Sequence, residues 1–320
     1  MRKWTVLVLG VALAALLGVS QSAFAFATGD VFAAVGNGNV NVYDAAGNFL
    51  QTLSTGGGNY TTGMAFTPTG DLLVTNFSDN SIYKFDPTGA LVGTFASGPT
   101  GTASNESIVR DLAGNYYVGH ADGNHEVAKF DAAGNLLTTY SVAIENRGSD
   151  WVDLAGDQHT LYYTSEGGSV KRFDLATNTQ LSDFATGLTG ESYALRILGD
   201  GGVLVANTDQ VVRLDAGGNV VQTYNVSGED SWFALNLDPD GKSFWSGNFN
   251  SGNAYKFDIA TGAVLETIST GSTAFFGLAV AGEITQGTGG NAVPEPASMV
   301  LMGVGLAGMG LKKLRRAKKA

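Results

Sequence analysis

The chain has 320 residues, 44% of them apolar, which is ample for a buried core, and only 15% of them charged. Its net charge is −11 at pH 7, and eight of the 18 Lys and Arg residues lie in the two terminal segments, so the body is strongly acidic. This charge argues against nucleic acid as a partner, and the absence of Cys means that no disulfide stabilises the fold.

The first 25 residues have the three parts of a secretory signal peptide. Arg2 and Lys3 form a basic start, residues 4–19 form an apolar run, and Ala23-Phe24-Ala25 is a small-x-small cleavage site. We expect export through the Sec machinery and cleavage after Ala25, with Ala27 as the second choice. The alternative is an anchor helix that is not cleaved.

The body repeats one unit six times. Segments such as "VYDAAGNFLQTL", "KFDPTGALVGTF" and "KFDAAGNLLTTY" each place an Asp between two alternating apolar runs. Neighbouring copies of this Asp are 41 to 45 residues apart, at Asp44, Asp86, Asp131, Asp174, Asp215 and Asp258. Repetition at this period is typical of an array of supersecondary units.

Each unit reads as four strands with tight turns, in which the Asp accepts backbone N–H groups. Four strands in about 40–45 residues are typical of a β-propeller blade. The first unit lacks one strand, and "STAFFGLAVAGEI" near the end supplies an unpaired one. We therefore predict an all-β, six-bladed propeller over residues 26–283, closed by pairing Phe276–Ala281 with Val31–Val35. The alternatives are an open solenoid or two separate domains.

One unit carries a resemblance to known repeats. The segment "DLAGNYYVGHADGNHEVAKFDAAGNLLTTY" resembles an NHL-type repeat, and related propellers include YVTN-type repeats and gluconolactonase-like enzymes. The resemblance covers residues 30–282. It implies the fold and leaves the function open, because propellers host many activities.

Polar and aromatic side chains recur where each blade's second strand ends and its first strand begins. Loops at these positions share one face of a propeller, which commonly holds the ligand. The residues that we expect at this channel mouth are Asn76, Glu106, His120, Asp150, Trp151, Glu191, Asn207, Asp230, Trp232 and Asn248. Such a ring suits a sugar or a cation, whereas the alternative is that these are solvated loop residues and core aromatics.

Metal binding and catalysis have weaker support in the sequence. "HADGNHE" gathers His120, Asp122 and His125 as metal-ligand candidates, although the repeat pattern itself places "NH" here and Asn39, Asn80 and Asn253 hold the same place in other blades. The chain has no nucleophile elbow, phosphate loop or zinc-protease motif, so we assign no catalytic residue and no required cofactor. A lactonase-like enzyme that binds Ca²⁺ through Glu106, Asp150 and Asn207 is the alternative.

The C-terminus combines three features in a fixed order. Residues 284–293 are expected to be a Gly/Thr-rich linker, and Pro294-Glu295-Pro296 follows it. Residues 297–311 are uncharged and span about 22 Å as a helix, which is short for a bilayer core of about 30 Å. A basic cluster that includes Lys312, Lys313, Arg315 and Arg316 then ends the chain, and it would stay cytoplasmic.

This tail, residues 294–320, resembles the PEP-CTERM sorting signal of Gram-negative bacteria. The resemblance implies that an exosortase-type enzyme recognises Pro294-Glu295-Pro296 and removes the tail after transient association with the inner membrane. The alternative is a plain membrane anchor. We expect a protein of the cell envelope, cell surface or extracellular matrix, linked to exopolysaccharide and biofilm.

Three functions are compatible with these patterns. The first is a non-catalytic binding module for a glycan or a surface protein. The second is a metal-dependent hydrolase or lyase, and the third is a structural matrix component without a ligand. The scarcity of His, with three in the chain, and the lack of catalytic motifs favour the first and third.

Overall fold

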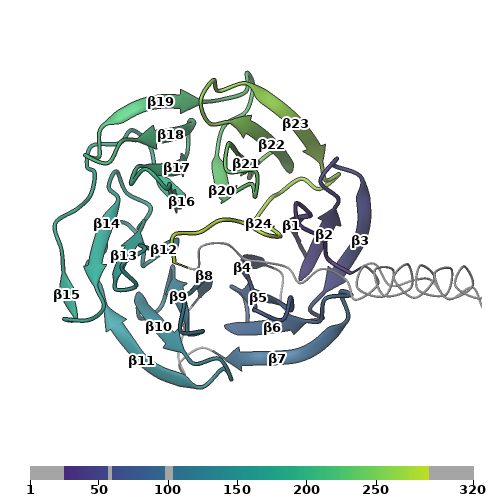
Figure 1. Ribbon diagram of the computed structural model, residues 1–320, viewed down its shortest axis with the longest axis horizontal. Coiled ribbons are helices and arrows are strands. Elements are labelled where there is room, and N and C mark those ends of the chain that lie inside the picture. Colours follow the sequence, from purple (N-terminus) through teal and green to yellow (C-terminus); the bar gives the residue numbers. More distant parts are fainter. Residues whose placement is uncertain (1–24, 57–59, 98–103, 288–320) are drawn as a thin grey trace, which may run out of the picture.

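A computed structural model describes residues 25–56, 60–97 and 104–287. These residues form six four-stranded antiparallel sheets that stand around a central axis like the blades of a propeller (Figure 1). The predicted six-bladed architecture is therefore confirmed. The signal peptide, the sorting triplet and the basic cluster lie outside the described residues.

Each blade runs from an innermost strand at the axis to an outermost strand at the rim. From the axis outward, the first blade consists of β24 (Gly277–Val280), β1 (Val31–Gly36), β2 (Asn39–Tyr43) and β3 (Phe49–Ser54). The second consists of β4 (Thr61–Phe66), β5 (Leu72–Asn76), β6 (Ser81–Phe85) and β7 (Leu91–Ser97). The third consists of β8 (Asn105–Arg110), β9 (Tyr116–His120), β10 (Glu126–Phe130) and β11 (Leu136–Ser141).

The remaining three blades follow the same order along the chain. The fourth consists of β12 (Val152–Leu154), β13 (Thr160–Tyr163), β14 (Lys171–Asp174) and β15 (Thr179–Gln180). The fifth consists of β16 (Ser192–Ile197), β17 (Val203–Asn207), β18 (Val211–Leu214) and β19 (Val220–Tyr224). The sixth consists of β20 (Trp232–Leu237), β21 (Ser243–Asn248), β22 (Asn253–Asp258) and β23 (Val264–Ser269).

The ring closes through the two ends of the described chain. Strand β24 pairs antiparallel with β1, with Val280 opposite Val31 and Gly277 opposite Ala34. This is the predicted closure, and it gives the first blade its innermost strand. Gly277 is required there because a Cβ would overlap the backbone carbonyl of Thr62 in the next blade.

The repeated Asp organises the outer hairpin of each blade. In the third blade, Asp131 Oδ1 accepts the backbone N–H groups of Ala133 and Asn135, each at 2.9 Å. Gly134 follows with a φ of 85°, a conformation that favours glycine. The equivalent Asp of every other blade likewise accepts backbone N–H groups two and three or four residues ahead, as the sequence predicted.

Burial falls from the axis to the rim of each blade. All residues of β4 and β5 are buried, whereas β3 and β7 are exposed or half-buried at all positions but one in each strand. Inner strands are covered on both faces by neighbouring blades, so they carry continuous runs of small and apolar residues. Within the described ranges no helix is long and apolar enough to cross a bilayer.

Residues 284–287 extend the packed domain beyond its predicted end at residue 283. In Figure 1 the yellow C-terminal segment runs from β24 across the centre of the ring toward β12. Gly287 lies against Leu154 and the carbonyl of Arg110, and its own carbonyl accepts an N–H from Gln158 at 2.9 Å. The first four residues of the predicted linker, 284–287, are therefore packed against the ends of the innermost strands.

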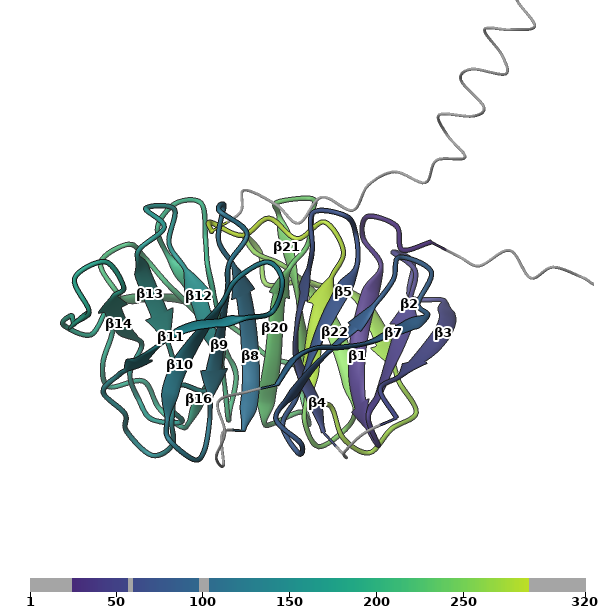
Figure 2. The ribbon, with the colours of Figure 1, turned by 90° about the horizontal axis from the view of Figure 1, so that it is seen from below.

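Two faces of the ring follow from these positions. We call the face where the innermost strands begin the start face and the face where they end the end face. The C-terminal segment covers the end face, as the upper rim of Figure 2 shows. The start face carries the pocket described next.

Candidate functional site

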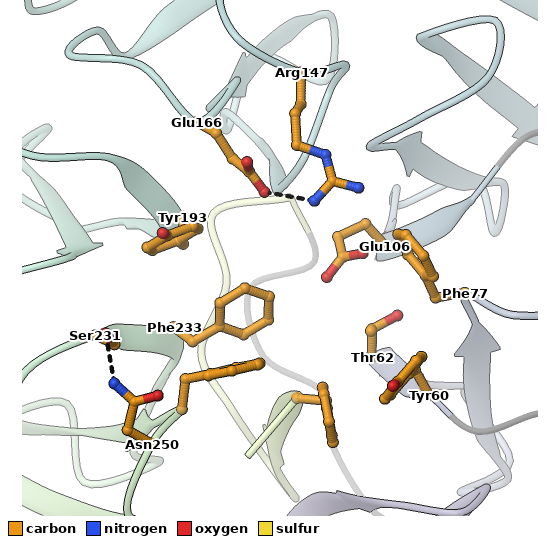
Figure 3. Close-up of a pocket in the computed structure, with 12 residues that line it drawn as sticks. Tyr60, Thr62, Phe77, Glu106, Arg147, Glu166, Tyr193, Ser231, Phe233 and Asn250 are labelled. Carbon is orange, nitrogen blue, oxygen red and sulfur yellow. Dashed lines mark hydrogen bonds and ion pairs between the residues drawn. The ribbon is translucent and has the colours of Figure 1, made fainter. Parts of the chain in front are cut away.

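A cavity of about 540 Å³ opens at the centre of the start face (Figure 3). All six blades or their connecting loops contribute to its lining, since it forms where the first residues of the innermost strands meet. Its lining residues are Tyr60, Thr62, Phe77, Glu106, Arg147, Glu166, Tyr193, Ser231, Phe233, Phe249, Asn250 and Phe276. The volume lies within the usual range of about 300–1,000 Å³ for small-molecule sites.

Five aromatic rings form a continuous arc along one side of the cavity. In order, the ring centroids are 5.1 Å apart for Tyr193 and Phe233, 5.5 Å for Phe233 and Phe249, and 5.3 Å for Phe249 and Phe276. Tyr60 completes the aromatic arc at 4.6 Å from Phe276, and 42% of its surface is exposed. These rings present faces and edges to any ligand in the cavity.

The other side of the cavity is charged. The Arg147 guanidinium forms ion pairs with Asp122 and with Glu166, the latter at 3.0 Å, and lies 5.7 Å from the centroid of the Phe77 ring. Its two carboxylate partners therefore neutralise Arg147. Figure 3 shows Arg147 and Glu166 together on the side away from Ser231 and Asn250.

Two further carboxyl groups near Arg147 have no hydrogen-bond partner among the described residues. Glu106 lines the cavity with only 3% of its surface exposed, and no hydrogen bond reaches its carboxyl group from the described residues. Asp150 is 1% exposed, and neither of its carboxyl oxygens has a partner in the described part of the chain. Burial raises the pKa of both groups well above the usual range, and the charge of Asp150 raises that of Glu106 further.

The end face also holds two buried acids, Glu283 and Asp153, but their carboxyl oxygens all accept hydrogen bonds. Glu283 Oε1 accepts from Arg196 Nε at 2.9 Å and from Leu237 N at 2.7 Å, and Oε2 accepts from Asn236 Nδ2 at 2.7 Å. Neighbouring Asp153 accepts the backbone N–H groups of Leu154 and Ile197, both at 2.9 Å. Burial still raises the pKa of Asp153 to about 6, although Arg196 opposes the shift.

Of the residues predicted at the channel mouth, the structure places Glu106 in the cavity lining. The Asn residues that end second strands are fully buried and support loops. Asn248 Oδ1 accepts the N–H groups of Asn250 and Ser251, both at 3.0 Å, and Asn207 Oδ1 accepts that of Asp209 at 3.1 Å. Asn76 serves its loop in the same way, through Ser78 N at 2.9 Å.

The predicted aromatics Trp151 and Trp232 are core residues. Trp232 makes edge contacts with Tyr255 and Phe257, at centroid distances of 5.5 Å, while Trp151 lies under the Arg196 guanidinium. Because side chains alternate along a strand, the residue after Trp232 points the other way, and Phe233 lines the cavity instead. The phase of the alternation was misassigned by one residue.

The predicted acids Glu191 and Asp230 are exposed beside the cavity and support its lining. Glu191 accepts the Tyr193 hydroxyl at 2.6 Å, and Asp230 accepts the Asn250 amide at 3.1 Å. His120 is fully buried, and burial lowers its pKa to about 4, so its ring is neutral near pH 7.

The weak metal candidates do not come together. Asp122 pairs with Arg147, and His125 is a turn residue with a φ of 60°, like Asn80 at the equivalent place in the second blade. Across the described ranges, no group of three or more His, Asp or Glu side chains is arranged to hold a metal ion.

Several lining residues had a sequence signal that we did not use. Phe77 and Phe249 directly follow the Asn that ends a second strand, in two different blades. Recurrence of an aromatic at that position would have indicated the cavity. Arg147 and Glu166 lie in irregular loops of the fourth blade and had no such signal.

Comparison with solved structures supports the architecture. The chain is similar to a protein of unknown function from Bacteroides caccae, with 13% identity, a TM-score of 0.62, and 78% of this chain and 97% of that one covered. A structure from a nidogen/laminin complex matches at 14% identity and a TM-score of 0.64, over 78% and 97%. The WD40 β-propeller domain of Doa1 matches at 14% and 0.59, over 78% and 81%.

At this identity the likeness concerns the fold alone, so the protein is a β-propeller with a pocket on its start face. No curated protein matches the chain. The NHL- or YVTN-like character of the repeats stays a prediction.

The C-terminus supplies the one family match. Residues 292–316 match the PEP-CTERM protein-sorting motif, which contains Pro294-Glu295-Pro296 and the basic residues Lys312, Lys313, Arg315 and Arg316. The chain thus carries the sorting signal predicted from its sequence. The motif indicates an exported protein that is sorted at the cell envelope and implies processing by an exosortase-type system.

Proposed function

We propose that this exported, exosortase-sorted propeller is a non-catalytic binding module whose cavity binds a glycan. The observation that carries the proposal is the aromatic arc opposite the charged side of the same cavity. Sugar rings have apolar C–H faces and hydroxyl edges, so they suit aromatic faces on one side and carboxyl groups on the other.

The sorting signal gives this binding a setting. We propose that the signal peptide directs Sec-dependent export in a Gram-negative bacterium, and that the tail holds the chain at the inner membrane until the sorting enzyme acts. The propeller would then bind exopolysaccharide at the cell surface or in the extracellular matrix. A surface protein as ligand, or a structural role without ligand, is the competing proposal.

Truncation of the aromatic arc tests glycan binding. Phe233→Ala and Phe249→Ala should each weaken binding of the producer's extracellular polysaccharide about tenfold, which corresponds to about 1.4 kcal/mol. The affinity is measured by titration calorimetry on the purified protein. Phe49→Ala is the matched control, because Phe49 is an exposed aromatic on β3 outside the cavity.

The control variant should bind like the parent chain. Equal affinities for the parent, both arc variants and the control would place the polysaccharide elsewhere on the surface. Absence of any binding by the parent would leave the structural role as the better proposal.

A further inference from the structure

The charge of the ligand can be inferred from Glu106. Its carboxyl group lines the cavity, is more than nine-tenths buried, and has no hydrogen-bond partner among the described residues. Figure 3 shows it pointing into the cavity from the side that faces Phe233. Buried polar groups in proteins are nearly always satisfied, so an orphan at the wall of a pocket indicates a missing partner.

The described residues supply no separate cation for this group, because Arg147 also serves other carboxylates. Asp122, Glu166, Glu106 and Asp150 surround a single guanidinium, that of Arg147, and the first two form its ion pairs. Glu106 and Asp150 are therefore left without a positive partner of their own. A ligand group that carries positive charge would stabilise the ionised form of Glu106, whose pKa burial raises, so the site favours a cationic ligand group over a neutral or negative one.

The rest of the cavity distinguishes an organic cation from a metal ion. A divalent ion such as Ca²⁺ needs six to eight oxygen ligands, whereas the aromatic arc that lines much of the cavity offers ring faces. An ammonium group needs only a carboxylate and is also attracted to aromatic faces. The neighbourhood of Glu106 therefore fits an organic ammonium group better than a hard metal ion.

We propose that the cavity is selective for an amino sugar with a free, unacetylated amine, whose ammonium group binds at Glu106 while its ring lies on the aromatic arc. This inference rests on the proposed glycan binding and specifies the class of glycan. An N-acetylated sugar would bring a neutral amide to Glu106 and leave the buried carboxyl group without its cation. Selectivity thus comes from the unpaired acid, and general affinity comes from the rings.

The test compares two oligosaccharides that differ only in acetylation. Tetramers of β-1,4-linked glucosamine and of N-acetylglucosamine are titrated into the full chain at pH 6.5, where the amine is charged. We expect the glucosamine tetramer to bind at least tenfold more tightly. Glu106→Gln should remove this preference by weakening the amine probe alone, and Phe233→Ala should weaken both probes.

Each outcome decides the proposal. Equal binding of both tetramers, unchanged by Glu106→Gln, overturns the amine selectivity but leaves glycan binding intact. Binding of the producer's polysaccharide without binding of the glucosamine tetramer does the same. If neither the tetramers nor the polysaccharide binds, the proposed function fails and the inference fails with it.

Two measurements guard the interpretation of the Glu106 variant. Its thermal unfolding shows whether it folds, and Asp150→Asn provides a second variant that removes a neighbouring carboxyl group without touching the cavity lining. Because the charge of Asp150 raises the pKa of Glu106, Asp150→Asn favours the ionised form of Glu106 and should keep the preference for the amine. A rise in melting temperature with Ca²⁺ alone that Glu106→Gln abolishes would identify a metal site and overturn the proposal.

Discussion

The two faces of the ring each bury acidic side chains near the central axis, in opposite ways. At the end face, every carboxyl oxygen of Glu283 and Asp153 accepts an N–H group, and Arg196 lies between them. At the start face, Glu106 and Asp150 have no such donors in the described chain. The residue types and the depth of burial are alike, so the difference lies in the partners.

This difference distinguishes buried acids that hold the fold together from buried acids that are available to a ligand. A buried acid whose oxygens are all bonded holds segments of the chain together, as Glu283 holds the C-terminal segment to the fifth and sixth blades. A buried acid without donors destabilises the fold and is retained where a ligand or a function requires it. The end face is thus a structural closure, whereas the start face keeps the unpartnered acids of the proposed binding site.

The largest effect is expected when the buried group of Arg196, Glu283 and Asp153 at the end face loses its cation. Arg196→Met should lower the free energy of unfolding by about 3–5 kcal/mol, because it leaves Glu283 and Asp153 buried without a cation. Denaturant titration measures the change. The control is Arg213→Met, which removes the more exposed ion pair with Asp200 and should cost about 0–1 kcal/mol. Similar losses of unfolding free energy for both variants would show that Arg196 stabilises the fold no more than a partly exposed ion pair does.

The next test uses His120 behind the start face. Its pKa of about 4 lies below the unfolded value, so stability is complete above pH 6.5 and is lost as the pH falls toward 4, by about 3 kcal/mol. His120→Asn introduces the residue that ends the second strand in three other blades, at Asn76, Asn207 and Asn248. The variant should lose this part of the pH dependence in urea titrations at pH 7 and pH 4. A slope identical to the parent's would contradict the buried, neutral ring.

The smallest effect is expected where stability changes with pH in the opposite direction to that at His120, namely at Asp150. Its pKa is raised in the folded state, so its contribution to stability is present below the unfolded value near 4 and is lost as the pH rises. Asp150→Asn should therefore gain stability relative to the parent between pH 4 and pH 8, by about 1–3 kcal/mol. Urea titrations at the two pH values measure this gain.

Asp131→Asn is the control for that series. The side chain and backbone of Asn135 lower the pKa of Asp131, so its pH dependence should run in the reverse direction. If Asp150→Asn instead loses stability at pH 8, a donor or cation must satisfy Asp150 in solution.

The fold could be predicted because its determinants are local. Each turn Asp bonds to residues two to four positions ahead, so its spacing along the chain reveals the blades directly. The missing strand of the first unit and the spare strand near the end predicted the closure of β24 onto β1. The packing of residues 284–287 was not predicted because their partners are distant in the sequence: Gln158, which donates to the carbonyl of Gly287, is 129 residues away, and no local pattern records this contact.

The site was harder to predict because it depends on which face of its strand each individual side chain points to. Glu106 was predicted at the channel mouth and lies in the cavity lining, whereas Asn76 and Trp232 were chosen where the neighbouring Phe77 and Phe233 line the cavity. Alternation along a strand turns an error of one residue into the opposite face of the sheet. The loops that carry Arg147 and Glu166 do not follow the repeat pattern, so their position beside the cavity could be seen only in the structure.

The position of Gly287, where the described chain ends, can be compared with the position of the cavity. The described chain ends on the end face, while the cavity opens on the start face, with the depth of the ring between them. If the tail holds the protein at a surface, as we propose, the cavity lies on the face of the ring opposite to the one where the described chain ends. Because residues 283–287 lie across the far end of the axis, a polymer that enters the cavity cannot pass through the ring to the opposite face.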